Sequence, residues 1–137
     1  MARRSEPTLE ALAALAAGHS DARRFREAAA VYRRIGKLMP DASGALYNEA
    51  MALWASGDIG PAVALLERVA TTAHRARALV RIADIDPKAL SAADRVDIEH
   101  GAANELDPAT RADLGFAHAG LLEREGDYEA AFAAYAA

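Results

Sequence analysis

The chain has 137 residues, 53% hydrophobic and 26% charged, and we expect a single domain over residues 1–137. Its net charge of −4 argues against a general nucleic-acid binder, and the lack of cysteine excludes disulfides, a thiolate nucleophile and a cysteine-based zinc site. Much of the hydrophobic fraction is alanine, a strong helix former with a small side chain. The composition therefore favours an all-α fold with closely packed helices.

The first predicted hairpin joins a helix that ends near Gly18 to a helix over residues 25–38. Ser5 can cap the first helix with Pro7 in its first turn, because a side-chain oxygen satisfies free amides there and proline needs no hydrogen bond. Pro40 stops the second helix, since a proline disfavours helical backbone in the residue before it. The two helices are expected to run antiparallel.

The second predicted hairpin covers residues 44–56 and 59–72, with Gly57 and Asp58 between its helices. Glycine adopts the left-handed conformation that ends a helix at little cost. An aspartate at the next position can cap the following helix. This hairpin is the most regular part of the sequence.

The third predicted hairpin is degenerate. Its first helix, residues 75–85, is cut short by Asp86 and Pro87. Ser91 and Asp94 have the spacing of an imperfect capping box, which opens a helix that reaches about Glu105. We therefore expect two helices here with an irregular connection.

The fourth predicted hairpin begins with Asp107 as cap and Pro108 in the first turn, and turns again at Gly126 and Asp127. Its last helix starts at Tyr128 and is rich in alanine, without a polar closing segment. Since helical arrays need a polar outer face at their ends, we expect either a fragment of a longer protein or an end that a partner covers. Self-association is one way to cover it, and the alternative is a short helix that frays in water.

A fixed period runs through these hairpins. Three times a large apolar residue is followed by alanine three positions later and by another large apolar residue seven positions later. The sets are Phe25, Ala28, Tyr32; Ile59, Ala62, Leu66; and Tyr128, Ala131, Tyr135. The first and second sets are 34 residues apart and the second and third are 69 apart, close to twice that period. Such a period is typical of stacked helical repeats.

These residues resemble the tetratricopeptide repeat family, with the best match over residues 45–53 and 57–62. The family's small residues match alanines in first helices (Ala16, Ala50, Ala119) and in second helices (Ala28, Ala62, Ala131). The resemblance implies a right-handed superhelix of about four antiparallel helical hairpins, with units at residues 9–42, 43–76, 77–110 (degenerate) and 111–137 (truncated). It also implies that Phe25, Ile59 and Tyr128 pack the hairpin turns. Glu49 departs from the pattern, because leucine is usual at its position.

Residues 114–123 and 126–135 are also similar to the last repeat before the catalytic domain of bacterial repeat-containing sulfotransferases. That resemblance implies an accessory region of a longer enzyme. The glycine-rich phosphate-binding loop of such an enzyme is absent from these 137 residues. Catalysis would then lie beyond Ala137.

No catalytic, cofactor or metal site is expected in this chain. Its four histidines lie on different predicted helices or turns, without the i, i+4 spacing of paired metal ligands. The acidic residues from Asp84 to Glu99 lack the glycine of a calcium-binding loop, and Pro87 interrupts them. Helix capping and solvation account for these side chains.

A predicted peptide-binding groove involves the first helix of the second hairpin, where Tyr47, Met51 and Trp54 form a stripe at i, i+4 and i+7. In the repeat family, first helices line the concave groove. A shift by one period adds Arg81 and Ile85 from the next first helix. Aromatic and methionine side chains beside a basic residue can anchor a peptide. The alternative is that this stripe packs against the next hairpin.

Asn48 matches an asparagine with which some modules of the family clamp a peptide's carboxylate, and it completes the predicted groove. The matching places in neighbouring units hold alanine or isoleucine, so a clamp for chaperone tails is not expected. A basic run over residues 23–37 could attract acidic partners or form a solvated helix face.

We expect a cytoplasmic scaffold that binds a protein or peptide in this groove, with no catalysis, cofactor or nucleic-acid partner. Two basic residues near the start, Arg3 and Arg4, precede no continuous apolar segment, and no uncharged stretch approaches 20 residues. A membrane partner is therefore not expected either. The alternative function is the accessory region of a longer enzyme such as a sulfotransferase.

Overall fold

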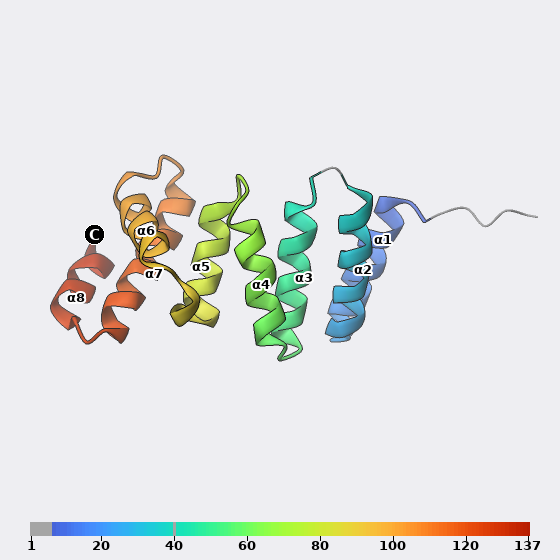
Figure 1. Cartoon of the computed structure of the whole chain (residues 1–137), viewed down its shortest axis with the longest axis horizontal. Coiled ribbons are helices and arrows are strands. Elements are labelled where there is room, and N and C mark those ends of the chain that lie inside the picture. Colours follow the sequence, from blue (N-terminus) through green and yellow to red (C-terminus); the bar gives the residue numbers. More distant parts are fainter. Residues whose placement is uncertain (1–6, 40) are drawn as a thin grey trace, which may run out of the picture. The chain divides into compact units, whose positions relative to one another are not determined.

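The computed structural model describes residues 7–39 and 41–137, and this part of the chain is all-α (Figure 1). Eight α-helices and one short 3-10 helix follow one another in the described residues. They are α1 (Leu9–Asp21), α2 (Phe25–Leu38), α3 (Ser43–Ala55), α4 (Ile59–Val69), α5 (Arg75–Ile85), η1 (Pro87–Ala89), α6 (Ala92–Asn104), α7 (Pro108–Arg124) and α8 (Tyr128–Ala136). Helices that are adjacent in the chain pack together in pairs, as in helical repeat proteins.

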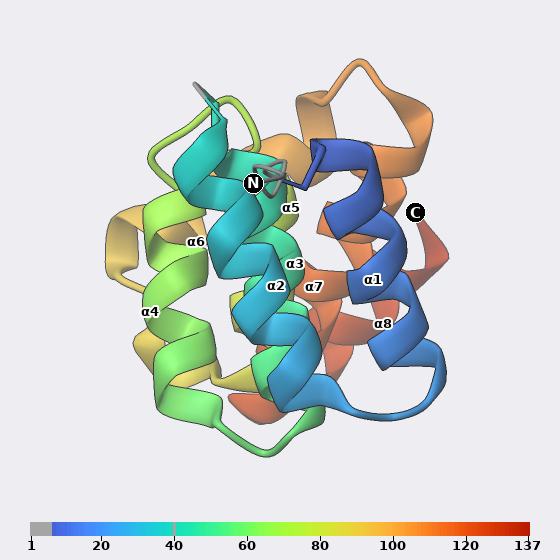
Figure 2. The same ribbon diagram turned by 90° about the vertical axis from the view of Figure 1, so that its right-hand side faces the viewer.

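The chain divides into two compact units within α4, the first ending at Leu65 and the second covering Leu66–Ala137. In the first unit α2 packs against both α1 and α3, and Figure 2 shows α1 and α2 side by side with α3 behind them. One buried cluster joins Leu12, Ile35 and Ala45. A second cluster joins residues of α2, α3 and α4, namely Ala28, Ala29, Ala52, Leu53 and Ala62. Alanine makes up four of the five residues of the second cluster, so its helices must lie close together to exclude water.

In the second unit α7 is the central helix, because it packs against α5, α6 and α8. Leu79 and Ile82 of α5, Ile98 of α6 and Leu114 of α7 are at most 2% exposed. The connection η1 separates α5 from α6, as the interruption at Pro87 predicts. This unit thus has a regular last hairpin and an irregular third one.

One turn geometry recurs where the first, second and fourth hairpins reverse direction. Arg23, Gly57 and Gly126 occupy its left-handed position with φ of 58°, 88° and 83°. In each turn the next amide donates to the carbonyl five residues earlier: Arg24 to His19 (2.8 Å), Asp58 to Leu53 (2.8 Å) and Asp127 to Leu122 (3.0 Å). The repeat seen in the sequence is therefore also a repeat of backbone hydrogen bonding.

The predicted bounds of the later helices are largely confirmed. Ser91 and Asp94 form the capping box of α6, and the side chains of Asp107 and Asp127 cap α7 and α8. The first helix differs from its prediction, because Thr8 caps it and Pro7 precedes it. It also continues past the predicted stop at Gly18 to Asp21. The predicted roles of Ser5 and Pro40 lie outside the described residues.

The six alanines that match small positions of the repeat pattern are all buried, with at most 2% exposure. They are Ala16, Ala28, Ala50, Ala62, Ala119 and Ala131. The prediction for the turn residues is wrong in two of three cases. Phe25 is partly buried, but Ile59 is 39% exposed and Tyr128 is 69% exposed. A residue that begins a second helix lies at the edge of its hairpin, where little covers it.

Candidate binding site

Four of the predicted groove residues lie on α3 in the first unit. Tyr47 is only 6% exposed, so most of its ring belongs to the core, whereas Asn48 is exposed. Met51 and Trp54 are half-buried, and Trp54 packs against the alanine-rich cluster of α2, α3 and α4. On this helix the aromatic stripe thus contributes to packing as well as to surface.

The other two predicted groove residues, Arg81 and Ile85, lie on α5 in the second unit, and both are half-buried. The guanidinium Nη1 of Arg81 lies 3.8 Å from the carboxylate Oδ2 of Asp84, one turn further along the helix. Such an exposed pair contributes little to stability. The position of Arg81 is more informative than this ion pair, because Arg81 borders a hollow of the second unit.

That hollow, which we call the aromatic groove, lies among α5, α7 and α8 and has a volume of about 650 Å³. Its apolar lining includes Phe116 of α7 and Tyr128 and Tyr135 of α8. Its charged lining includes Arg81, Asp84, Asp113, Glu123 and Arg124. A groove with ring surfaces and charges of both signs can bury an apolar side chain and orient a polar backbone beside it.

The side chains of α7 and α8 hold one another in place along this groove. The rings of Phe116 and Tyr135 lie 6.0 Å apart between centroids and are tilted by 49°, a favourable aromatic arrangement. The hydroxyl of Tyr135 donates to Oε2 of Glu123 at 3.1 Å. This hydrogen bond is the main reason that the pKa of Tyr135 is raised above its usual value. The contacts leave the ring of Tyr135 in a defined orientation at the groove.

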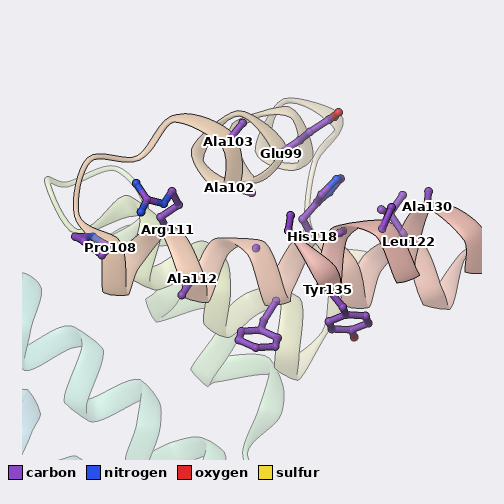
Figure 3. A pocket seen from close by; sticks show the side chains of 15 residues that line it. Glu99, Ala102, Ala103, Pro108, Arg111, Ala112, His118, Leu122, Ala130 and Tyr135 are labelled. Carbon is purple, nitrogen blue, oxygen red and sulfur yellow. The ribbon is translucent and has the colours of Figure 1, made fainter.

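A second hollow of about 830 Å³ lies among α6, α7 and α8. Figure 3 shows Ala102 and Ala103 of α6 on one side and Ala112 and Arg111 of α7 on the other. Its lining is dominated by alanine, and Nη1 of its Arg111 donates to the carbonyl of Glu105 at 3.1 Å. The larger hollow therefore offers mostly methyl groups, and fewer charged side chains than the aromatic groove to orient a ligand.

A charge network of the second unit links α5 to α6. Nη2 of Arg75 lies 2.8 Å from a carboxylate oxygen of both Asp94 and Asp97. Burial alone would raise the pKa of Asp94, but hydrogen bonds from Ser91 and Arg75 outweigh it, so the pKa is lowered. This network ties α5 to the capped start of α6. It strengthens the irregular third hairpin.

Sequence reasoning placed Arg81 in a groove but missed the aromatic residues that line it. Tyr128 and Tyr135 were recognised only as apolar positions of the repeat, Phe116 was not singled out, and the exposure of these three rings was not predicted. A usable signal was present, because the large apolar residues of α8 recur at i, i+4 and i+7 on one face, whereas the buried position of the repeat is alanine. Among residues 7–39 and 41–137, no group of acidic or histidine side chains could hold a metal ion. In the same residues no helix is long and apolar enough to cross a membrane.

No protein-family model matches the chain. No curated protein matches it significantly either.

Proposed function

We propose that this chain is a helical-repeat interaction module of the tetratricopeptide type, which binds a peptide segment of another protein in the aromatic groove. The observation that carries the proposal is the groove itself, where Arg81 and three exposed or half-exposed rings meet in one hollow. The recurring turn and the six buried alanines support the repeat assignment. A right-handed superhelix of about four hairpins would follow from that assignment.

The lining favours a particular kind of peptide. Phe116 and Tyr128 are 65% and 69% exposed, so an apolar side chain that covered them would remove ring surface from water. Arg81 and Arg124 can pair with a carboxylate of the peptide, and Asp113 can pair with a basic group. The expected ligand is therefore a short segment with an apolar anchor between charged residues.

A peptide selected from a displayed random library, then synthesised and titrated by fluorescence anisotropy, tests the proposal. Arg81→Glu should weaken binding at least about tenfold, because it reverses a charge at the groove. Phe116→Ala should weaken it to a similar extent by removing exposed ring surface. The matched control is Arg77→Glu, one turn earlier on α5 and outside the groove lining.

Circular dichroism should show the same helix content in all three variants. The proposal fails if the library yields no binding peptide. It also fails if the selected peptide binds the Arg81 and Phe116 variants as tightly as the unchanged protein.

A further inference from the structure

We propose that α8 is the contact surface of a symmetric dimer of this chain. The helix carries an aromatic stripe of Tyr128, Phe132 and Tyr135, spaced at i, i+4 and i+7 on one face. These side chains are 69%, 77% and 46% exposed, whereas Ala131 between them is 2% exposed. A helix with large apolar residues outside its buried face is normally covered by another element.

The corresponding residues of α2 and α4 are buried, so this face of the helix is covered in the other repeats. Phe132 corresponds to Ala29 of α2 and Val63 of α4, which are 2% and 6% exposed. In the first unit Ala29 belongs to a cluster that includes residues of α3. The equivalent face of α8 packs no such helix in the described second unit, so Phe132 remains open.

A second copy of α8 fits this face because the stripe is nearly palindromic. With a two-fold axis near Phe132 and the helices antiparallel, Phe132 meets its own counterpart and Tyr128 meets the partner's Tyr135. Glu129 is the one charged residue within α8, so little like-charge repulsion opposes the contact. An isologous contact of this kind closes after two copies and does not form filaments.

The exposed area suits a weak dimer. Phe116 contacts Tyr135 and is 65% exposed, so it extends the stripe onto α7. At about 200 Å² for each aromatic side chain, the four rings leave about 500 Å² open on each copy. Two copies would bury about 1,000 Å², the lower limit for a specific interface. A dissociation constant on the order of 100 µM is expected.

Sedimentation equilibrium from about 10 µM to 1 mM, concentrations chosen around that constant, tests the dimer. The average mass should rise from 14.5 kDa toward twice that value. Phe132→Ala should keep the protein monomeric, and it leaves the fold intact because the side chain is 77% exposed. The control is Val96→Ala on α6, which removes an apolar side chain of 61% exposure elsewhere in the same unit. A monomer at every concentration overturns the proposal, and so does a dimer that Phe132→Ala leaves unchanged.

Cysteine crosslinking tests the two-fold arrangement without interference, since the natural chain has no cysteine. Under mild oxidation Phe132→Cys should form a disulfide-linked dimer quickly, and Val96→Cys should not. If Phe132→Ala abolishes association but Phe132→Cys fails to crosslink, a head-to-tail contact replaces the proposed symmetric one.

This inference goes beyond the proposed peptide binding and can fail independently of it. Arg81 lies outside the aromatic stripe and Phe132 lies outside the groove lining, so each substitution tests one surface. Arg81→Glu should leave the sedimentation profile unchanged. Because Phe116, Tyr128 and Tyr135 belong to both surfaces, a bound peptide should also shift the dimer toward monomer. If a peptide binds the aromatic groove and leaves the monomer–dimer equilibrium unchanged, the dimer contact does not cover the groove.

Discussion

In α2, Tyr32 packs against both buried clusters of the first unit, whereas in α8 the corresponding Tyr135 is 46% exposed and bonds to Glu123. The two helices share the same spacing of large residue, alanine and large residue, and in both the alanine is buried. The difference arises from the following helix, because α3 packs on α2 in the first unit. A repeat pattern thus defines which faces of a helix are apolar, and the neighbours decide which of them become core.

The largest difference is expected from truncating the two tyrosines. Tyr32→Ala should lower the free energy of unfolding by about 2 kcal/mol, because it leaves a gap between two packed clusters. Tyr135→Ala should have a smaller effect on stability, since nearly half of the surface of Tyr135 is exposed. Urea unfolding followed by circular dichroism at 222 nm measures both. The protein concentration should be a few micromolar, because the proposed dimer would cover α8 at high concentration. Equal losses in the free energy of unfolding at that concentration would mean that α8 is covered in solution.

The next largest effect concerns the recurring turn. Arg23 has φ of 58°, in the region where a side chain is strained, while the other two hairpins have glycine there. Arg23→Gly should therefore raise the free energy of unfolding by about 1 kcal/mol, which makes the first turn equivalent to the others. The reverse changes Gly57→Ala and Gly126→Ala should each cost about as much.

These reverse changes isolate the backbone effect, because an added methyl group at Gly57 or Gly126 meets no atom within 4 Å. Thermal unfolding of the three variants at one protein concentration provides the comparison. If Arg23→Gly lowers stability while both alanine variants also lower it, side-chain contacts of Arg23 outweigh its strain.

The local structure was largely predictable from sequence for physical reasons that can be named. Gly57, Asp107 and Ser91 act through their own backbone and neighbouring amides, so spacing alone identified their turn and caps. Alanines at the small positions were predictable because close helix approach excludes larger side chains. The first helix was less predictable, since Pro7 and Thr8 compete as its start and Gly18 is tolerated inside it.

The site was less predictable, because it depends on which neighbours cover each face. Tyr47 and Trp54 have the spacing of a surface stripe, yet most of Tyr47 is core and Trp54 packs on a buried cluster. Arg81 was identified by its repeat position, but the rings beside it come from α7 and α8, about 35 to 54 residues later in the chain. No local pattern reports such a contact, since only tertiary packing brings these helices together.

The smallest expected effect completes the comparison of the two hairpins at the position after the turn. Arg24 precedes α2 and forms no side-chain cap, whereas the corresponding Asp127 accepts a hydrogen bond from the amide of Ala130 at 3.2 Å. Arg24→Asp should therefore stabilise the first hairpin by about 0.5 kcal/mol, through the cap and through the removal of a positive charge from a helix start. Arg24→Ala separates the two causes, because it removes the charge without adding a cap. At the cap of α7, hydrogen bonds from Thr110 lower the pKa of Asp107. A cap of the same kind at position 24 should contribute its full gain at pH 7 and lose it as the pH falls through the lowered pKa of the new carboxyl. If Arg24→Asp and Arg24→Ala have the same stability at pH 7, the backbone at the start of α2 does not allow the cap that α8 has. The two hairpins would then differ in backbone geometry as well as in the helices that pack on them.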